Sequence, residues 1–279
     1  MSNKFPINPN KEYLLSQLSK GNRVDGRGLE DYRPITIEFG VAGKADGSAS
    51  VKLGNTYVLA GVKAEIGKPF SDTPDEGVLL VNSEFVPFAS PEFDPGPPDE
   101  NSIELARVVD RGLRHSNLVD FKDLCIVPGE KVWMLWTDIY VLDYVGDLID
   151  AAGLAALAAL MDVKLPVVEV KDGEVIKSDK LVPLKVCDYP VAVTVGKIKD
   201  YFIVDPSIEE EDLLDCRLTV VSTKDDDICA LQKSFSGTFT RDEVLQAIEL
   251  GVKKGKELRK LLLDSFEMYK SERVGDVNG

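Results

Sequence analysis

The chain has 279 residues, of which 44% are hydrophobic and 29% are charged. This composition is typical of a globular protein and excludes an intrinsically disordered chain. The net charge of −15 repels polyanions. Binding of a nucleic acid would therefore require a local cluster of arginines and lysines, together with a partner that supplies more positive charge.

The sequence has no pattern typical of a membrane-spanning helix or of a secreted protein. The longest uncharged apolar stretch, Ala151 to Met161, is about half of the roughly 20 residues that a membrane-spanning helix needs. Met1 to Asn10 lacks the apolar region of a secretory signal, so we expect a cytoplasmic protein. The four cysteines are scattered without a C-x-x-C pair, which predicts reduced thiols and no zinc site.

The first part of the chain is typical of an antiparallel meander. Four runs of β-type composition are separated by Gly, Asp and Pro: Ile35 to Phe39, Ser48 to Leu53, Thr56 to Glu65 and Val78 to Val86. The proline-rich, acidic segment from Phe88 to Glu100 predicts an exposed loop. A helix to about Ser116 should follow, with Asn101 as its N-cap and Glu104 in the capping-box position.

The middle of the chain predicts the central elements of the fold. Lys131 to Tyr144 is apolar at both parities, which indicates a central strand buried on both faces. Gly146 to Met161 is rich in Ala and Leu all round, which predicts a helix buried between layers. Strands should then recur near Val167 to Val170, Val191 to Val195, Tyr201 to Val204, Leu214 to Val221 and Ile228 to Lys233.

A final helix from about Arg241 to Tyr269 completes the second half, with Thr240 and Glu243 as its capping box. The two halves therefore look like variants of one plan, with strands first and helices after. We expect an N-terminal arm over residues 1–20, a first half over 21–161 and a second half over 162–279, packed as one α+β unit.

Several common chemistries are excluded or disfavoured. A single histidine, His115, and the absence of G-x-S-x-G argue against a serine or cysteine hydrolase. The glycines of GVAGKADG have the wrong spacing for a P-loop or a dinucleotide site and predict hairpin turns. The acidic run from Glu209 to Asp212, with Asp215 nearby, is more typical of a solvated loop than of a cation site, so we assign no metal.

The predicted helix IELARVVDRGLR carries the most informative pattern. Arg107, Arg111 and Arg114 stand at i, i+4 and i+7, so they share one narrow face. The other side is apolar or small: Leu105, Val108, Val109, Gly112 and Leu113. Three guanidiniums on one face suit the binding of phosphates. The alternative is a solvated face with arginines paired to Glu104 and Asp110, and the spacing alone does not decide between them.

Three segments together resemble a known family. They are RVDGR at Arg23 to Arg27, the loop DPGPPDEN followed by ELARVVDRGLR at Glu104 to Arg114, and VLDYVGDLIDAAGLAALAAL at Val141 to Leu160. In combination they resemble RNase PH-like proteins, and specifically the catalytically inactive ring subunit of the archaeal exosome. The resemblance implies a duplicated βα fold of the ribosomal S5 domain 2 type.

The same resemblance implies an assembly and a reaction. Active and inactive subunits of that family alternate in a six-membered ring around a central RNA channel, with RNA-binding cap subunits. The active subunit is a phosphorolytic 3′→5′ exoribonuclease that uses inorganic phosphate and releases nucleoside diphosphates. We therefore expect an active paralogue, cap subunits and single-stranded RNA as partners, and neither DNA nor a membrane.

Departures from the active pattern predict that this chain has no activity of its own. Active relatives carry a D-G-G-T-R-like segment that holds the attacking phosphate, whereas this chain has a degenerate segment: Val145, Gly146, Asp147, Leu148 and Ile149. Isoleucine in place of the arginine removes charge-assisted hydrogen bonds, and Asp147 adds like charge, so phosphate should not bind. Active relatives also place two aspartates six residues apart, and the aligned residues, Glu209 and Asp215, retain that acidic pair only in part.

In this subunit type the equivalent arginine helix faces the partner's active site. The resemblance thus implies that Arg107 and Arg111 contact the RNA backbone, and that Arg114 contacts either RNA or the partner. The leading hypothesis is a non-catalytic subunit, without a cofactor, that structures the active site of its partner for RNA degradation. The alternatives are a self-sufficient phosphorolytic exoribonuclease acting through Glu209 and Asp215, and an acidic scaffold without RNA contact. No residue pattern assigns a role to the loop from Gly67 to Gly77.

Overall fold

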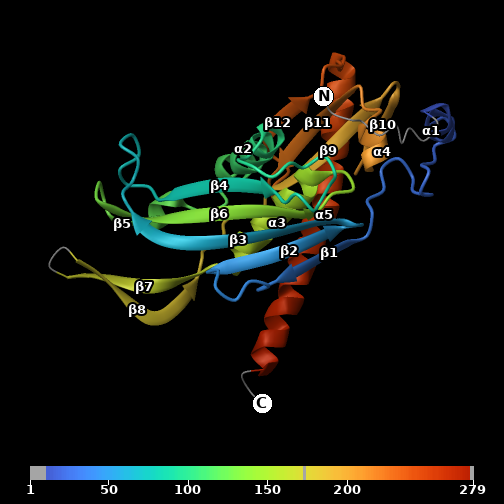
Figure 1. Ribbon diagram of the computed structural model, residues 1–279. Coiled ribbons are helices and arrows are strands. Elements are labelled where there is room, and N and C mark those ends of the chain that lie inside the picture. The colour runs from blue at the N-terminus through green and yellow to red at the C-terminus, as the bar shows by residue number, and fades with distance from the viewer. Residues whose placement is uncertain (1–10, 172–173, 277–279) are drawn as a thin grey trace.

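The computed structural model describes residues 11–171 and 174–276 (Figure 1). Three sheets and a set of helices make up an α+β architecture. The first sheet has the strand order β1-β2-β3-β6-β4, with β5 paired to β6. Its strands are β1 (Ile35–Phe39), β2 (Gly47–Leu53), β3 (Thr56–Gly67), β4 (Val78–Phe85), β5 (Cys125–Val127) and β6 (Lys131–Asp143).

The second sheet is antiparallel throughout, in the order β10-β9-β11-β12. Its strands are β9 (Val191–Ile198), β10 (Tyr201–Val204), β11 (Cys216–Ser222) and β12 (Ile228–Ser234). A separate hairpin of β7 (Lys164–Lys171) and β8 (Glu174–Pro183) projects from the body in Figure 1. The sequence predicted part of β7 but missed β8, because most β8 side chains are exposed and give no apolar alternation.

The helices are α1 (Lys11–Leu18), α2 (Glu100–His115), α3 (Leu148–Asp162), α4 (Ile208–Glu211) and α5 (Arg241–Asp276), with a 3₁₀ turn η1 (Phe121–Leu124). Helix α3 packs against β2 and β3 of the first sheet and against β9 of the second, and almost all of its side chains are buried. This confirms the predicted helix between two layers. One core cluster, which includes Leu53 and Ile139 from the first half and Val193 and Leu262 from the second, joins the halves.

The position of β4 corrects the predicted meander. Strands β1, β2 and β3 are antiparallel neighbours, but β4 lies parallel to β6 on its other side, with Val81 opposite Thr137. A parallel pair needs a crossover connection, and α2 supplies it between β4 and β6. Strand β6 is central, as predicted, but it is fully buried on only one face, since Met134 and Trp136 on the other face are half-buried.

The start of α2 also differs from the prediction, whereas α5 begins as expected. The N-cap of α2 is Asp99, whose carboxylate accepts a hydrogen bond from the Ser102 backbone N–H at 2.8 Å, so the choice of Asn101 was wrong. A carboxylate at this position also interacts favourably with the helix dipole. At α5, Thr240 and Glu243 form the predicted capping box, with hydrogen bonds of 2.7 and 3.3 Å.

Helix α5 packs across the second sheet against β9 and β11. Gly251 lies directly against Val220 and Gly255 against Ser222, so side chains at these two helical positions would collide with the sheet. Within the described residues, no helix is both long and apolar enough to cross a membrane. The part of the predicted N-terminal arm before Lys11 lies outside the described residues, and the proposed division of the chain into halves stays a prediction.

Candidate functional site

The RVDGR segment ties the start of the chain to the second half. The Arg23 guanidinium is buried and donates hydrogen bonds to the Glu210 carboxylate, to the Val204 carbonyl at 2.7 Å and to the Asp205 carbonyl at 2.6 Å. Arg27 donates to the Asp205 carboxylate at 2.7 Å. These two arginines are therefore occupied by groups of the chain itself, and the segment acts as a structural clamp.

Arg33 extends this network to the start of α3. Its guanidinium bonds to the Asp205 carboxylate at 2.5 Å and to the carbonyls of Val145 and Gly146 at 2.7 and 3.1 Å. Burial disfavours the charged form of Arg33, but Asp205 outweighs this effect and raises the pKa above its ordinary value. The Thr56 hydroxyl donates a further hydrogen bond to the Gly146 carbonyl at 2.7 Å. The backbone that precedes α3 is thus fixed from two sides.

The carboxylate of Glu211 lies at the N-terminus of α3. It accepts a hydrogen bond from the Asp147 backbone N–H at 3.0 Å and one from the Tyr144 hydroxyl. The Arg217 guanidinium lies 3.8 Å from the same carboxylate. Burial raises the pKa of Glu211, against the opposing effect of the hydrogen bond from Tyr144. Helix N-termini favour anions, and here the anion is part of the chain.

Two further carboxyl groups are buried beside this point. The Asp147 side chain is 1% exposed, and neither of its oxygens has a hydrogen-bond partner among the described residues. Burial, with the charge of Asp150 as the next cause, raises the pKa of Asp147 well above its ordinary value. Asp150 accepts hydrogen bonds from the Tyr32 hydroxyl at 2.6 Å and the Thr194 N–H at 3.0 Å, and burial raises its pKa to about 6. These two buried carboxyl groups offer no cation to an anion at the helix start.

The degenerate segment predicted from the sequence lies at this helix start. Val145 and Gly146 contribute the carbonyls that bind Arg33, Asp147 is the N-cap of α3 in a left-handed conformation, and Ile149 is buried in the core. Leu148 is the first helical residue and is partly buried against the same core. The segment therefore supplies no cationic side chain, and the absence of phosphate binding stays a prediction.

The three arginines of α2 lie on its outer face, opposite the buried apolar side, as the helical spacing predicts. Arg107 is exposed and makes no hydrogen bond or ion pair with any residue in the described part of the chain. Arg111 is half-buried, and its guanidinium donates to the Gln232 side chain of β12 at 3.0 Å. Both arginines therefore lie at the surface of α2, and Arg111 lies against β12.

Arg114 is held within the chain. Its guanidinium pairs with Asp110 at 2.6 Å and donates to the Leu79 carbonyl at 2.7 Å. The ion pair with Asp110 that we considered as an alternative thus exists for this arginine. Glu104 accepts a hydrogen bond from the Ser234 hydroxyl at 2.7 Å and pairs with no arginine among the described residues. Of the three arginines, only Arg114 forms, within the described part of the chain, the ion pair that the alternative of a paired, solvated face requires.

The two residues of the partly retained acidic pair are both exposed and have different hydrogen-bond partners. Glu209 is exposed and accepts a hydrogen bond from the Ser207 hydroxyl at 2.8 Å, whereas Asp215 accepts one from the Lys199 N–H at 2.7 Å. The expectation of a solvated acidic loop is wrong for Glu210 and Glu211, because Arg23 and the α3 N-terminus draw these two carboxylates inward. The described residues contain no group of three His, Cys, Asp or Glu side chains that is arranged to hold a metal ion.

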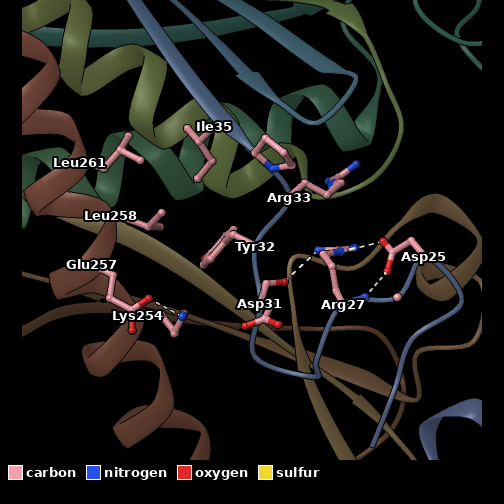
Figure 2. Close-up of a pocket in the computed structure, with 12 residues that line it drawn as sticks. Asp25, Arg27, Asp31, Tyr32, Arg33, Ile35, Lys254, Glu257, Leu258 and Leu261 are labelled. Carbon is pink, nitrogen blue, oxygen red and sulfur yellow. Dashed lines mark hydrogen bonds and ion pairs between the residues drawn. The ribbon is translucent and has the colours of Figure 1, made fainter.

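A pocket of about 670 Å³ opens between the RVDGR segment and α5. Figure 2 shows Arg27 directed toward Asp25 and Lys254 directed toward Glu257, and both are ion pairs. Acidic and basic side chains thus neutralise one another along its wall, and none of the α2 arginines lines it. The pocket adjoins the candidate site through Arg33, which lines it and also binds the backbone before α3, and through Tyr32, which lines it and donates a hydrogen bond to Asp150.

Two domain models of one protein family match this chain. The model described as "3' exoribonuclease family, domain 1" matches residues 31–166, and that described as "domain 2" matches residues 188–254. The chain belongs to the 3′ exoribonuclease family. The predicted α+β RNase PH fold is thereby confirmed.

The proteins and structures that are similar to this chain include exosome proteins of archaea. A protein of Methanothermobacter thermautotrophicus named "Exosome complex component Rrp42" is 49% identical over 261 residues, which cover 92% of this chain and 96% of that protein. The Pyrococcus furiosus protein of the same name is 48% identical, over 92% and 94% of the two chains. A structure titled "archaeoglobus fulgidus exosome with RNA bound to the active site" matches with a TM-score of 0.82 and 45% identity, over 89% of this chain and 96% of that chain. The predicted resemblance to an RNase PH-like subunit of the archaeal exosome is confirmed.

Several groups that build the site were not recognised in the sequence. Arg33, Asp205 and Arg217 carried no expectation, and Glu211 was treated only as part of an acidic run. The one available signal was RVDGR, whose two arginines require acidic partners when buried. The run near Glu210 was a candidate for those partners, but no spacing rule links segments so far apart in the sequence.

Proposed function

We propose that the chain is a non-catalytic subunit of an RNA-degrading exosome. It contacts the backbone of single-stranded RNA through Arg107 and Arg111 and shapes the active site of a paralogous phosphorolytic 3′→5′ exoribonuclease subunit. The names of its relatives, together with a similar structure titled as an exosome with bound RNA, support this role. The exposed Arg107 and the surface position of Arg111 support a contact with phosphates.

The observation that carries the non-catalytic role is the position of Glu211. Its carboxylate already accepts the N–H of Asp147 at the start of α3. Inorganic phosphate would have to displace this carboxylate and then lie beside the buried Asp147 and Asp150. Ile149 offers no compensating cation. These groups disfavour a second anion here, which supports the proposal that the chain does not bind the inorganic phosphate consumed in phosphorolysis.

The assembly that we propose is an alternating six-membered ring with the active paralogue, carrying RNA-binding cap subunits and acting in the cytoplasm. Inorganic phosphate is used by the active paralogue and no cofactor by this chain. Strands β4 and β12 end their sheets, and the exposed side chains of Ile228 and Leu231 lie on β12. Such edges support association with neighbouring subunits.

The test is release of nucleoside diphosphate from single-stranded RNA in the presence of inorganic phosphate. We expect no release by the chain alone and release when it is mixed with its active paralogue. In the mixture, changing both Arg107 and Arg111 to Glu should lower RNA affinity and turnover. Phosphate-dependent turnover by the pure chain, abolished by Asp215→Asn, would instead establish the self-sufficient enzyme. Unchanged RNA affinity after the charge reversal would establish the acidic scaffold.

A further inference from the structure

Phe235, the residue after β12, combines an unfavourable backbone conformation with an exposed ring. Its φ is +65°, in the left-handed region that side chains with a Cβ rarely adopt. The other non-glycine residues with positive φ in the described part of the chain are Asn, Asp and Lys. The Phe235 side chain is 48% exposed, so burial of the ring does not offset the conformational cost. Residues held in sparsely populated backbone conformations cluster at functional sites.

The ring of Phe235 is held in place from within the chain. The Arg217 guanidinium lies over it, 4.9 Å from the ring centre, and the Arg217 side chain is only 17% exposed. Arg217 is fixed in turn by β11 and by the carboxylate of Glu211 at 3.8 Å. The Lys233 ammonium donates a hydrogen bond to the Phe235 carbonyl. An arginine therefore covers one side of the ring while a large part of its surface remains open to solvent.

Phe235 also lies at the end of the strand that borders the α2 arginines. Figure 1 shows α2 beside β12, and side-chain hydrogen bonds connect them: Arg111 to Gln232 at 3.0 Å and Ser234 to Glu104 at 2.7 Å. Phe235 lies three positions after Gln232, which is about 10 Å along an extended chain. The exposed ring thus stands within a short distance of guanidiniums at the surface.

We propose that Phe235 is a stacking platform for a nucleobase of single-stranded RNA. This inference rests on the proposed function, because Arg107 and Arg111 would bind the backbone of the same strand. Aromatic rings beside cationic side chains are the arrangement by which proteins bind single strands without sequence preference. Arg217 supplies a cation at the ring and Lys233 one at the Phe235 carbonyl, and the nearby Glu104 is engaged by Ser234, in a chain whose overall charge is −15. A protein partner that covers the ring is the competing occupant.

The test compares RNA with and without bases on the complex of this chain with its active paralogue. Binding of fluorescein-labelled oligo(A) and of an abasic oligonucleotide of equal length is measured by anisotropy, for the unchanged complex and for Phe235→Gly. We expect Phe235→Gly to weaken oligo(A) binding by about five- to tenfold and to leave abasic binding unchanged. The Tm should stay equal or rise, because glycine adopts a positive φ without strain.

Two controls and one direct measurement accompany the comparison. Phe235→Tyr keeps a ring and should keep the affinity. Tyr13→Ala removes a 50% exposed ring from α1, which packs on the β10 side of the second sheet, and should change nothing. RNA that contains 5-iodouridine should form a photo-crosslink to Phe235, located by mass spectrometry of the digested complex.

Equal effects of Phe235→Gly on oligo(A) and abasic RNA, or no effect on either, would overturn the platform. Weaker assembly with the paralogue at unchanged RNA affinity would assign the ring to a protein interface and would overturn it as well. The charge reversal at Arg107 and Arg111 separates this failure from that of the proposed function. If the reversal lowers RNA affinity and Phe235→Gly does not, only the platform is wrong. If neither lowers it, both are wrong.

Discussion

At the start of α3 the cations and the helix N-terminus are bound by groups of the chain itself, whereas on the outer face of α2 the Arg107 guanidinium has no partner in the described part of the chain. Both places bring together groups that favour anions. At α3 the anion is the Glu211 carboxylate, so no further anion is needed. At α2 the partners among the described residues hold Arg114 and bind Arg111 through Gln232, and the Arg107 guanidinium is left facing solvent.

The same chain thus holds two places that favour anions in opposite states. At the start of α3 an internal carboxylate occupies the helix N-terminus, and on α2 a guanidinium remains at the surface. Under the proposed function, the first place no longer binds a small anion and the second binds a polymer of phosphates.

Asp205→Asn should cause the largest loss, because Arg27 and Arg33 would lose the charge that neutralises them in a mostly buried place. We expect the free energy of unfolding to fall by about 3–5 kcal/mol, measured by urea denaturation. Asparagine keeps the shape and tolerates the positive φ of this position. The control is Asp25→Asn, at a carboxylate that is 44% exposed, where a loss below about 1 kcal/mol is expected. Equal losses would show that the buried Asp205 contributes no more to stability than the exposed Asp25.

Glu211→Ala should lower the free energy of unfolding by about 2–3 kcal/mol. It leaves the Tyr144 hydroxyl and the Asp147 N–H without their acceptor in a buried place. Glu211→Gln keeps an acceptor oxygen and should cost less. Neither variant should show phosphate-dependent turnover alone, because Ile149 still provides no cation. Turnover by Glu211→Ala alone would contradict the account given for the start of α3.

Changing Arg107 and Arg111 to Glu should weaken RNA binding by the assembled complex at least about tenfold. If two phosphate contacts are lost, the slope of log affinity against log salt should become shallower by about 1.4, at about 0.7 per phosphate of a single strand. Titrations at several salt concentrations measure this slope. Arg114→Gln is the matched comparison, since Asp110 and Leu79 already hold that guanidinium. A similar change of slope for Arg114→Gln would place this arginine on the RNA as well.

Asp147→Asn should have the smallest effect and a characteristic dependence on pH. The pKa of Asp147 is raised in the folded chain, so the folded state holds a proton that the unfolded state has released. The free energy of unfolding therefore falls as pH rises from about 4 through the raised pKa. The asparagine variant carries no such proton, so we expect it to be more stable by about 1 kcal/mol at neutral pH and to lose this advantage in acid. Thermal unfolding across pH measures the difference, and a constant offset would contradict it.

Much of the fold could be predicted from the sequence because its signals are local. Three examples are the apolar residues on all sides of α3, the capping box at Thr240 and the alternating burial in β3. Each depends on residues within a few positions of one another. The place of β4 could not be predicted, because alternation is the same in parallel and antiparallel pairs and the partner strand lies far away in the sequence. The start of α2 failed for a smaller reason, since Asp99 and Asn101 are both good caps.

The candidate site also has one part that could be predicted from the sequence and one that could not. The arginine face of α2 follows from the helical period alone, and the structure places Arg107 and Arg111 at the surface. The groups that fill the start of α3 do not follow from any period. Glu211 binds a residue 64 positions away, and Asp205 binds Arg33 across 172 positions, so only the folded chain brings them together.

Helix α3 also bears on how the chain is made. Gly153 of α3 packs against Ala192 of β9, so part of the helix surface is covered by a strand that begins only at Val191. During synthesis, the ribosome delivers this apolar helix well before its second cover exists. The nascent first half therefore exposes an aggregation-prone surface until the second sheet is complete, which makes the interval between Met161 and Ser234 the vulnerable stage of biogenesis.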